Sequence, residues 1–282
     1  MKVEAASLSV QKLHQLLLGA IGPRPICFAS TVDAEGRRNL APFSFFNIFS
    51  ANPPIVVFSP ARSGRDGSNK HTYENVLEVP EVVINVVNYA MVHQTSLASS
   101  PFAKGVDEFE KSGFTPIASE TVQPWRVAES PVQMECDVLE VRPLGDGGGS
   151  GNLVICQVKL IHVNDDILDA DGRIDQTKID LVARMGGDWY CRAHGDALFS
   201  IAKPLTTVGL GVDALPDHIR LSHKLTGNHL GMLGNQETWP GEEEIQAALS
   251  MYGIQPSAED VAIRLLDQGE ARAALCVLLG SA

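Results

Sequence analysis

Residues 68–72 have the sequence SNKHT, which places a lysine among hydroxyl and amide side chains just before apolar residues at helical spacing. If Ser68 or Asn69 caps this helix, the first backbone amides have no intrahelical partners and point along the positive end of the helix dipole. Such amides suit a phosphate group, to which Lys70 would add a charge and Thr72 a hydroxyl. An ordinary capped helix with a solvated lysine is the competing interpretation of the same residues.

A second cluster of polar and aromatic side chains lies within residues 39–60, where Ser44, Phe45, Phe46 and Asn47 follow one another. Because alternate side chains of a strand face opposite ways, Ser44 and Phe46 would share one face of a strand. The backbone at such a strand end could pair with the polar edge of a heterocycle, and the rings could cover its apolar faces. A buried strand with a chance polar pair is the alternative.

The elements that must position these residues are short strands and helices. Apolar and β-branched runs predict strands over residues 26–32 and 81–88. Two more strands are expected within residues 39–60, divided near residues 50–54. A short helix is predicted over residues 7–22, because its leucines recur at helical spacing.

A long hairpin is predicted in the middle of the chain. Residues 131–144 and 152–163 alternate apolar and polar side chains, which is typical of antiparallel strands with one buried face. The Gly-rich residues 145–151 between them lack a following Lys-Ser or Lys-Thr pair, so they are expected to form a flexible turn and not a phosphate cradle.

The sequence pattern becomes helical toward the end of the chain. Residues 238–253 begin with a proline and acidic residues and continue with apolar residues at helical spacing. Residues 256–269 form a second predicted helix, with Ser257 as its N-cap and a glycine at its end. We therefore predict two domains, residues 1–204 and a helical extension over residues 205–282.

Composition and charge narrow the class of protein. The chain has 282 residues, 44% of them hydrophobic, and a formal net charge of −12. This charge repels phosphodiester backbones, so nucleic acid is not an expected partner. The five cysteines are odd in number and lack a C-x-x-C pair, which argues against a disulfide framework or a zinc knuckle. The apolar patch near the N-terminus is too short to span a bilayer, so we expect a cytoplasmic protein without a membrane segment.

Two further polar stretches of the sequence are not expected to form a metal site or an active site. His218, His223 and His229 are spaced by five and six residues, so they do not share one helical face and no metal site is predicted. Residues 107–113 are interpreted as a solvated helix end.

Several ordered blocks resemble one family. Residues 24–59, which begin RPICFASTVDAEGRRNLAPFSFFN, resemble the N-terminal signature of the flavin reductase-like, FMN-binding split-barrel family. KHTYENV, over residues 70–76, resembles the Lys-x-Thr-x-x-Asn segment of that family, and ARMGGDWYCR, over residues 183–192, its Arg-x-Gly-Gly-x-x-Tyr block. The resemblance extends over about residues 20–200.

The resemblance implies a mainly β fold, a six-stranded Greek-key split β-barrel with peripheral helices. It also implies a homodimer with a flavin near the subunit interface. The residues of this sequence that match the cofactor-binding positions of the family are Ser30, Thr31, Ser44, Phe45, Phe46, Asn47, Ser59, Lys70, Thr72, Arg184, Gly186 and Tyr190. Of these, Lys70 and Thr72 match the phosphate-binding pair, and Arg184 is implied as an anchor for the phosphate of the flavin or of a nicotinamide nucleotide.

The resemblance further implies an FMN-dependent oxidoreductase, with FAD as an alternative cofactor. NAD(P)H would deliver hydride to N5 of the flavin, so no catalytic side chain is predicted. The chain would then be an NAD(P)H:flavin reductase or a reductase component that supplies reduced flavin to a monooxygenase. A non-catalytic flavin-delivery protein is one alternative, and a flavoenzyme with tightly held FMN and an unknown organic substrate is another.

Overall fold

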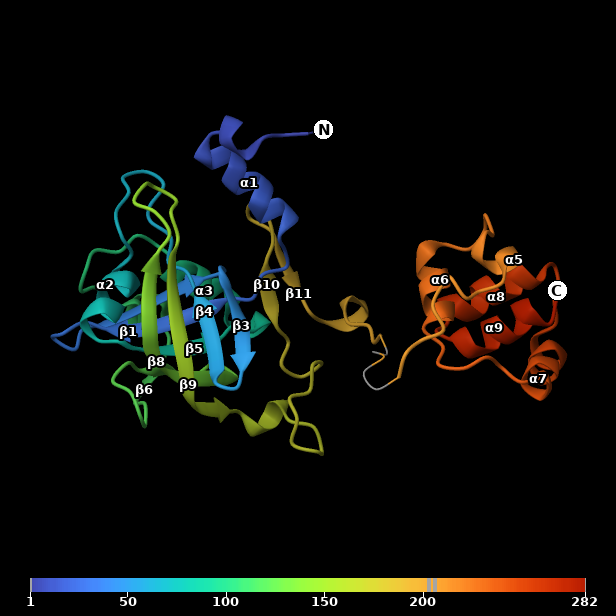
Figure 1. The fold of residues 1–282 in the computed structure, drawn as a ribbon. Coiled ribbons are helices and arrows are strands. Elements are labelled where there is room, and N and C mark those ends of the chain that lie inside the picture. The colour runs from blue at the N-terminus through green and yellow to red at the C-terminus, as the bar shows by residue number, and fades with distance from the viewer. Residues whose placement is uncertain (1, 202–203, 205–206, 282) are drawn as a thin grey trace. The chain divides into compact units, whose positions relative to one another are not determined.

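The computed structural model describes residues 2–201, 204 and 207–281. It divides the chain into two compact units, Met1–Phe199 and Ser200–Ala282, which are drawn in Figure 1. The predicted domain boundary between residues 204 and 205 falls at residues 205–206, which lie outside the described residues, so it stays a prediction.

The first unit is built on one antiparallel sheet of seven strands in the order β2-β1-β5-β8-β9-β4-β3. Its two long strands form the predicted hairpin, and its two edge strands are consecutive in the chain. The strands are β1 (Cys27–Val32), β2 (Arg38–Phe43), β3 (Phe46–Ala51), β4 (Pro54–Phe58), β5 (Glu81–Val86), β8 (Val132–Pro143) and β9 (Asn152–Val163).

The principal sheet has seven strands and not the expected six. The additional strand arises because the chain turns a corner at Ser44 and Phe45. On one side of this corner Phe43 pairs with Cys27 of β1, and on the other side Phe46 pairs with Phe58 of β4. The single strand expected before residues 50–54 is therefore two strands at opposite edges of the sheet. The predicted alternation of faces does not run through the corner for the same reason.

The sheet curls so that its two edges approach each other. The rings of Phe43 and Phe58 lie 5.6 Å apart, although five strand spacings separate β2 from β4 in the hydrogen-bonded order. Neighbouring strands are about 4.8 Å apart, so a flat sheet would hold these rings more than about 20 Å from each other. Buried residues of β1, β4, β5, β8 and β9 fill the inside of the curl. This arrangement fits a split barrel that remains open between β2 and β3.

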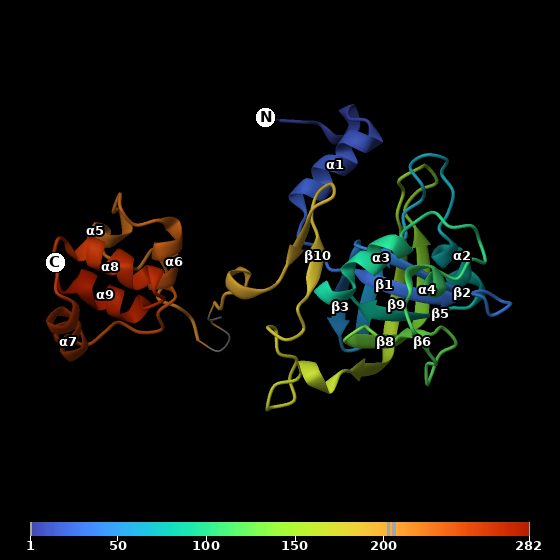
Figure 2. The same cartoon turned by 180° about the vertical axis from the view of Figure 1, so that it is seen from behind.

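Helices and short strand pairs cover the sheet, and Figure 2 shows α3 and α4 on the side of β1 and β2. Phe28 of β1 and Leu40 of β2 pack there against Phe109 of α4, so β1 is buried on both faces. The remaining elements of this unit are α1 (Val10–Ala20), α2 (His71–Glu78), α3 (Val92–Ala98), α4 (Glu108–Ser112), β6 (Pro116–Ile117), β7 (Arg126–Val127), β10 (Val182–Arg184), β11 (Tyr190–Arg192) and the 3₁₀ turns Ala5–Ser7, Tyr89–Met91, Asp165–Ile167 and Gly195–Ala197.

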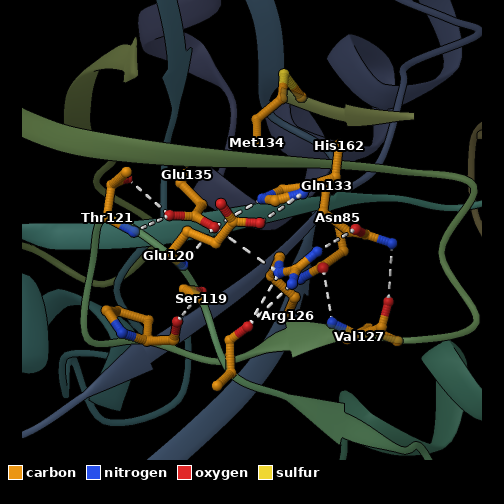
Figure 3. Close-up of polar contacts among 12 residues, drawn as sticks. Asn85, Ser119, Glu120, Thr121, Arg126, Val127, Gln133, Met134, Glu135 and His162 are labelled. Atoms are coloured by element: carbon orange, nitrogen blue, oxygen red, sulfur yellow. Dashed lines mark hydrogen bonds and ion pairs between the residues drawn. The ribbon is translucent and has the colours of Figure 1, made fainter. Parts of the chain in front are cut away.

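A buried carboxylate fixes the segment that precedes β7 (Figure 3). Glu135 of β8 is fully buried and accepts hydrogen bonds from the amides of Glu120 and Thr121 and from the Thr121 hydroxyl, at 2.6–2.9 Å. Nε2 of His162 lies 2.7 Å from the same carboxylate, and Nε of Arg126 lies 3.7 Å from it. Burial alone would raise the pKa of Glu135, but the hydrogen bonds it accepts, first that of the Thr121 hydroxyl, lower it to about 2.

The second unit is helical and has its own core. Its helices are α5 (Asp217–Arg220), α6 (Gly227–Gly234), α7 (Glu242–Tyr252), α8 (Ala258–Asp267) and α9 (Ala271–Leu279). The core includes Ile219, Leu233 and Leu275, all fully buried. Ser257 caps α8 as predicted, since its hydroxyl accepts from the amide of Asp260 at 3.2 Å.

Within the described ranges, no helix is both long and apolar enough to cross a membrane. The three histidines of the second unit do not form part of a metal site among the described residues. His229 instead accepts a hydrogen bond from the amide of Thr226 at 3.3 Å and so closes a capping box at the start of α6.

Candidate functional site

The first unit contains a cavity of about 460 Å³ between the corner of the edge strands and the start of α2. Its volume lies within the range of about 300–1,000 Å³ that small-molecule and cofactor sites occupy. Ser44, Phe45 and Ser59 line it on the sheet side, and Lys70 and Thr72 line it at the helix. Five of the twelve predicted cofactor-binding residues therefore lie around one cavity.

The start of α2 leaves two backbone amides open at this cavity. Lys70 is the N-cap of the helix and gives no side-chain cap, and the amides of His71 and Thr72 have no hydrogen-bond partner in the described part of the chain. Neither Ser68 nor Asn69, the two candidate caps, is the N-cap of the helix. Ser68 instead turns to Asp66, whose carboxylate accepts from the Ser68 hydroxyl at 2.7 Å and from its amide at 3.0 Å. The open amides keep the anion-binding character of a helix N-terminus.

A buried network holds the Thr72 hydroxyl in place. The side-chain amide of Asn39 donates to Thr72 Oγ1 at 3.0 Å and to Thr31 Oγ1 at 3.3 Å. Asn75 donates to the same Thr31 oxygen at 3.1 Å. Because Thr72 accepts from Asn39, its own hydroxyl proton is left to donate to a ligand. Thr31 lines neither cavity described here and acts on the site through Asn39.

One buried acceptor in the lining lacks a partner. Oδ1 of Asn69 is buried and makes no hydrogen bond within the described residues. A buried polar atom without a partner is costly, so a ligand hydroxyl or N–H at this point would satisfy it.

The same loop contains a carboxylate with a lowered pKa. Hydrogen bonds from the side chain and amide of Ser68 lower the pKa of Asp66 to about 2. Asp66 is therefore a carboxylate at neutral pH, in a lining that also contains Arg65 and Lys70.

The corner of the sheet supplies an apolar wall. Phe45 remains 39% exposed, and the ring of His14 from α1 meets its ring edge-on at 6.2 Å. The backbone carbonyl of Phe45 accepts from the amide of Ser59 at 2.8 Å, which fixes the corner to the end of β4. The Ser59 hydroxyl accepts from the amide of Asn152 at 3.0 Å and so binds the corner to the hairpin. A flat ligand could thus lie on the ring of Phe45, whose position is fixed by hydrogen bonds at the end of β4 and the start of β9.

Three other predicted residues do not line this cavity. Ser30 is fully buried in β1 and its hydroxyl has no partner within the described chain. Phe46 packs against the interior of the curled sheet, because the strand restarts there on the other edge. Asn47 is exposed, and its side-chain oxygen accepts from the amide of Ile48 at 2.8 Å.

The last three predicted residues lie on or beside the β10–β11 turn. Arg184 and Tyr190 line a second cavity of about 370 Å³, together with Ser44. Gly186 lines neither of the two cavities, and a Cβ on it would lie 3.1 Å from the Cα of Gly19 in α1. The structure thus gives Gly186 a packing role against α1.

Sequence reasoning missed several residues of the first cavity. Asn39 lies in a strand, where nothing in its local sequence sets it apart. The loop residues Ser99 and Phe102 reach the cavity only through the tertiary fold. Glu108 also lines it and is buried, so the interpretation of residues 107–113 as a solvated helix end is wrong. Burial raises the pKa of Glu108, and its carboxylate accepts from the amide of Leu40 at 2.9 Å.

Comparison with known proteins gives the class of this fold and site. A flavin reductase like domain matches residues 20–178, and the chain therefore belongs to the flavin reductase-like family. An uncharacterized protein of Halalkalibacterium halodurans is 37% identical over 206 residues, which is 72% of this chain and 97% of the relative.

Two solved structures share the fold. Nitrilotriacetate monooxygenase component B of Bacillus cereus has 30% identity and a TM-score of 0.66, covering 71% of this chain and 98% of its own. A candidate flavin reductase with a split barrel domain from Shewanella frigidimarina has 27% identity and a TM-score of 0.60, covering 71% and 96%. In each case the match spans nearly the whole relative and leaves part of this chain uncovered.

Proposed function

We propose that the first unit binds FMN in the cavity of about 460 Å³ and acts as an NAD(P)H-dependent flavin oxidoreductase. The observation that carries the proposal is the pairing of two unpartnered helix amides, at His71 and Thr72, with the exposed ring of Phe45 across one cavity. One end of the cavity suits a phosphate and the other suits an aromatic ring system.

The residues present fit a phosphorylated flavin. The phosphate would be held by the His71 and Thr72 amides, the Thr72 hydroxyl and Lys70, whose exposed side chain is free to approach it. The unpartnered oxygen of Asn69 would accept a hydroxyl or N–H of the cofactor. Phe45 and Ser44 would lie against the ring system, and Ser59 would fix the corner that carries them.

The bound flavin would supply the redox chemistry by accepting hydride at N5 and passing electrons on. The chain would contribute orientation, because holding two reacting rings in contact removes an entropic cost of up to several kcal/mol. Backbone amides near the corner would stabilise negative charge on a reduced ring. No side chain is assigned a proton-transfer role.

The name of the Bacillus cereus neighbour, component B of a monooxygenase, and the flavin reductase-like family together support a reductase component that supplies reduced flavin to a monooxygenase. The homodimer, a cytoplasmic location and the use of NADH or NADPH stay predictions. A flavoenzyme with permanently held FMN and an unknown organic substrate is the second candidate function.

The experiment that tests the phosphate assignment compares FMN with riboflavin. Lys70→Ala should weaken FMN binding, measured by calorimetry, and leave riboflavin binding unchanged, because riboflavin has no phosphate. Lys178→Ala is a matched control, since Lys178 lines neither of the two cavities. Equal losses for both flavins would overturn the assignment. NADH or NADPH oxidation that depends on added free flavin would separate the reductase from the enzyme with permanently held FMN.

A further inference from the structure

The second cavity adjoins the first and has a different character. Its volume is about 370 Å³, and it shares Pro42, Phe43, Ser44 and Ser99 with the lining of the first cavity. The two spaces therefore meet at the corner of the sheet. Whatever occupies the second cavity would lie next to the part of the first that we assign to the flavin ring.

A cation without an acidic partner lines this cavity. Arg184 stacks on the ring of Tyr190, with its guanidinium carbon 4.4 Å from the ring centroid. One of its N–H groups donates to the carbonyl of Gly187 at 2.7 Å. Among the described residues Arg184 makes no ion pair, so most of its donors are available to a ligand.

A second guanidinium is close to Arg184 but is not part of the lining. Arg24 is bridged to Arg184 by two backbone hydrogen bonds of 2.9 Å and is only 7% exposed. Its side chain donates to the carbonyls of Leu18, Ile21 and Met185, and no carboxylate within the described residues forms an ion pair with it. Burial and the charge of Arg184 lower the pKa of Arg24. Arg24 already donates to three backbone carbonyls and does not line the cavity, so Arg184 is the cation that the described lining offers to a ligand.

The other lining residues indicate which kind of ligand would fit the second cavity. Ile26, Phe43 and Val92 are apolar, and Thr95 and Ser96 offer hydroxyls. A stacked arginine with free donors matches a planar carboxylate, to which it can donate two parallel hydrogen bonds. The single carboxylate in the lining, among the described residues, belongs to Asp188 on the same turn. It reduces the positive charge of the cavity but forms no ion pair with Arg184 in the described part of the chain.

We infer that the second cavity binds a small planar organic carboxylate next to the flavin, with Arg184 as its anchor. The inference rests on the proposed function for the identity of the neighbouring cofactor, and it names the substrate class of the combined site. The apolar wall holds the body of the ligand, and Arg184 holds its charge. Asp188 weakens the attraction and so sets a limit on affinity.

The test uses the full chain with and without FMN, and benzoate and its neutral isostere benzamide as probes in calorimetry. Benzoate should bind at least about tenfold more tightly than benzamide, because only the anion can use Arg184 fully. Arg184→Gln should remove this preference, Arg184→Lys should reduce it, and Asp188→Asn should tighten benzoate.

The outcomes separate the two proposals. If FMN binds but benzoate binds no more tightly than benzamide, the second site is wrong and the flavin site stands. If benzoate shows the preference while FMN does not bind, the flavin assignment is wrong and the carboxylate site stands. The comparison of the two probes on the unmodified protein needs no variant, so a variant that fails to fold does not prevent the test.

Discussion

The side-chain amide of Asn39 on β2 donates to the hydroxyl of Thr72 in the first turn of α2, at 3.0 Å. This hydrogen bond joins an edge strand to the helix whose two open amides face the cavity. It also orients Thr72, because the hydroxyl that accepts from Asn39 must donate its proton elsewhere. The position of one strand thus determines where the site can hold a phosphate.

Replacing Thr72 tests this arrangement. Thr72→Val should weaken FMN binding by about ten- to a hundredfold, since a hydrogen bond to a charged group contributes about 1.5–3 kcal/mol. Riboflavin binding should stay unchanged, and Thr72→Ser should retain FMN affinity because it keeps the hydroxyl. Fluorescence titration of both flavins measures the effect. A Val variant that binds FMN as tightly as the unmodified chain would contradict the role of the hydroxyl.

The lowered pKa of Glu135 predicts how the stability of the fold changes in acid. Its pKa is about 2 in the folded chain, below the ordinary value of 4.5, so its contribution to stability is complete above about pH 4.5 and is lost as the pH falls toward 2. A shift of this size corresponds to about 3 kcal/mol. Glu135→Gln should lower the free energy of unfolding at pH 7 by about this amount and flatten its dependence on pH below 4.5.

The measurement is urea unfolding between pH 7 and pH 2.5. Glu140→Gln is the matched control, because Glu140 is exposed on the same strand β8 and should behave like the unmodified chain. A Glu135→Gln variant with the acid sensitivity of the unmodified chain would contradict the role of this carboxylate.

The helical unit should fold independently of flavin binding, because its core is made of its own residues. Leu275→Ala should cost that unit about 2–5 kcal/mol, since the side chain is fully buried. Leu221→Ala should cost much less, because Leu221 is 58% exposed. Scanning calorimetry should show one transition shifted by Leu275→Ala and FMN affinity unchanged. A parallel loss of FMN affinity would mean that the two units are energetically coupled.

Elements governed by local sequence could be predicted. The β8–β9 hairpin follows from alternation on either side of a Gly-rich turn, and the cap of α8 follows from Ser257. The Lys70 and Thr72 pair could be placed because both belong to one helix start. In each case the determining residues are neighbours in the sequence.

Other features depend on contacts between distant segments. The corner at Ser44 and Phe45 exists because Phe43 and Phe46 pair with different strands, which no local pattern reveals. Ser30 and Thr31 could not be sited, because β1 is buried on both faces and shows no alternation. The placement of Arg184 in a second cavity depends on its backbone pairing with Arg24, across most of the length of the unit.

The central claim is that the first cavity holds FMN with its phosphate at the start of α2. The most direct measurement is isothermal titration of the purified full-length chain, freed of bound small molecules, with FMN and with riboflavin. The account predicts that FMN binds with one site per chain and more tightly than riboflavin, and that this difference disappears in Lys70→Ala. A folded chain that binds neither flavin, or binds both equally, would contradict it.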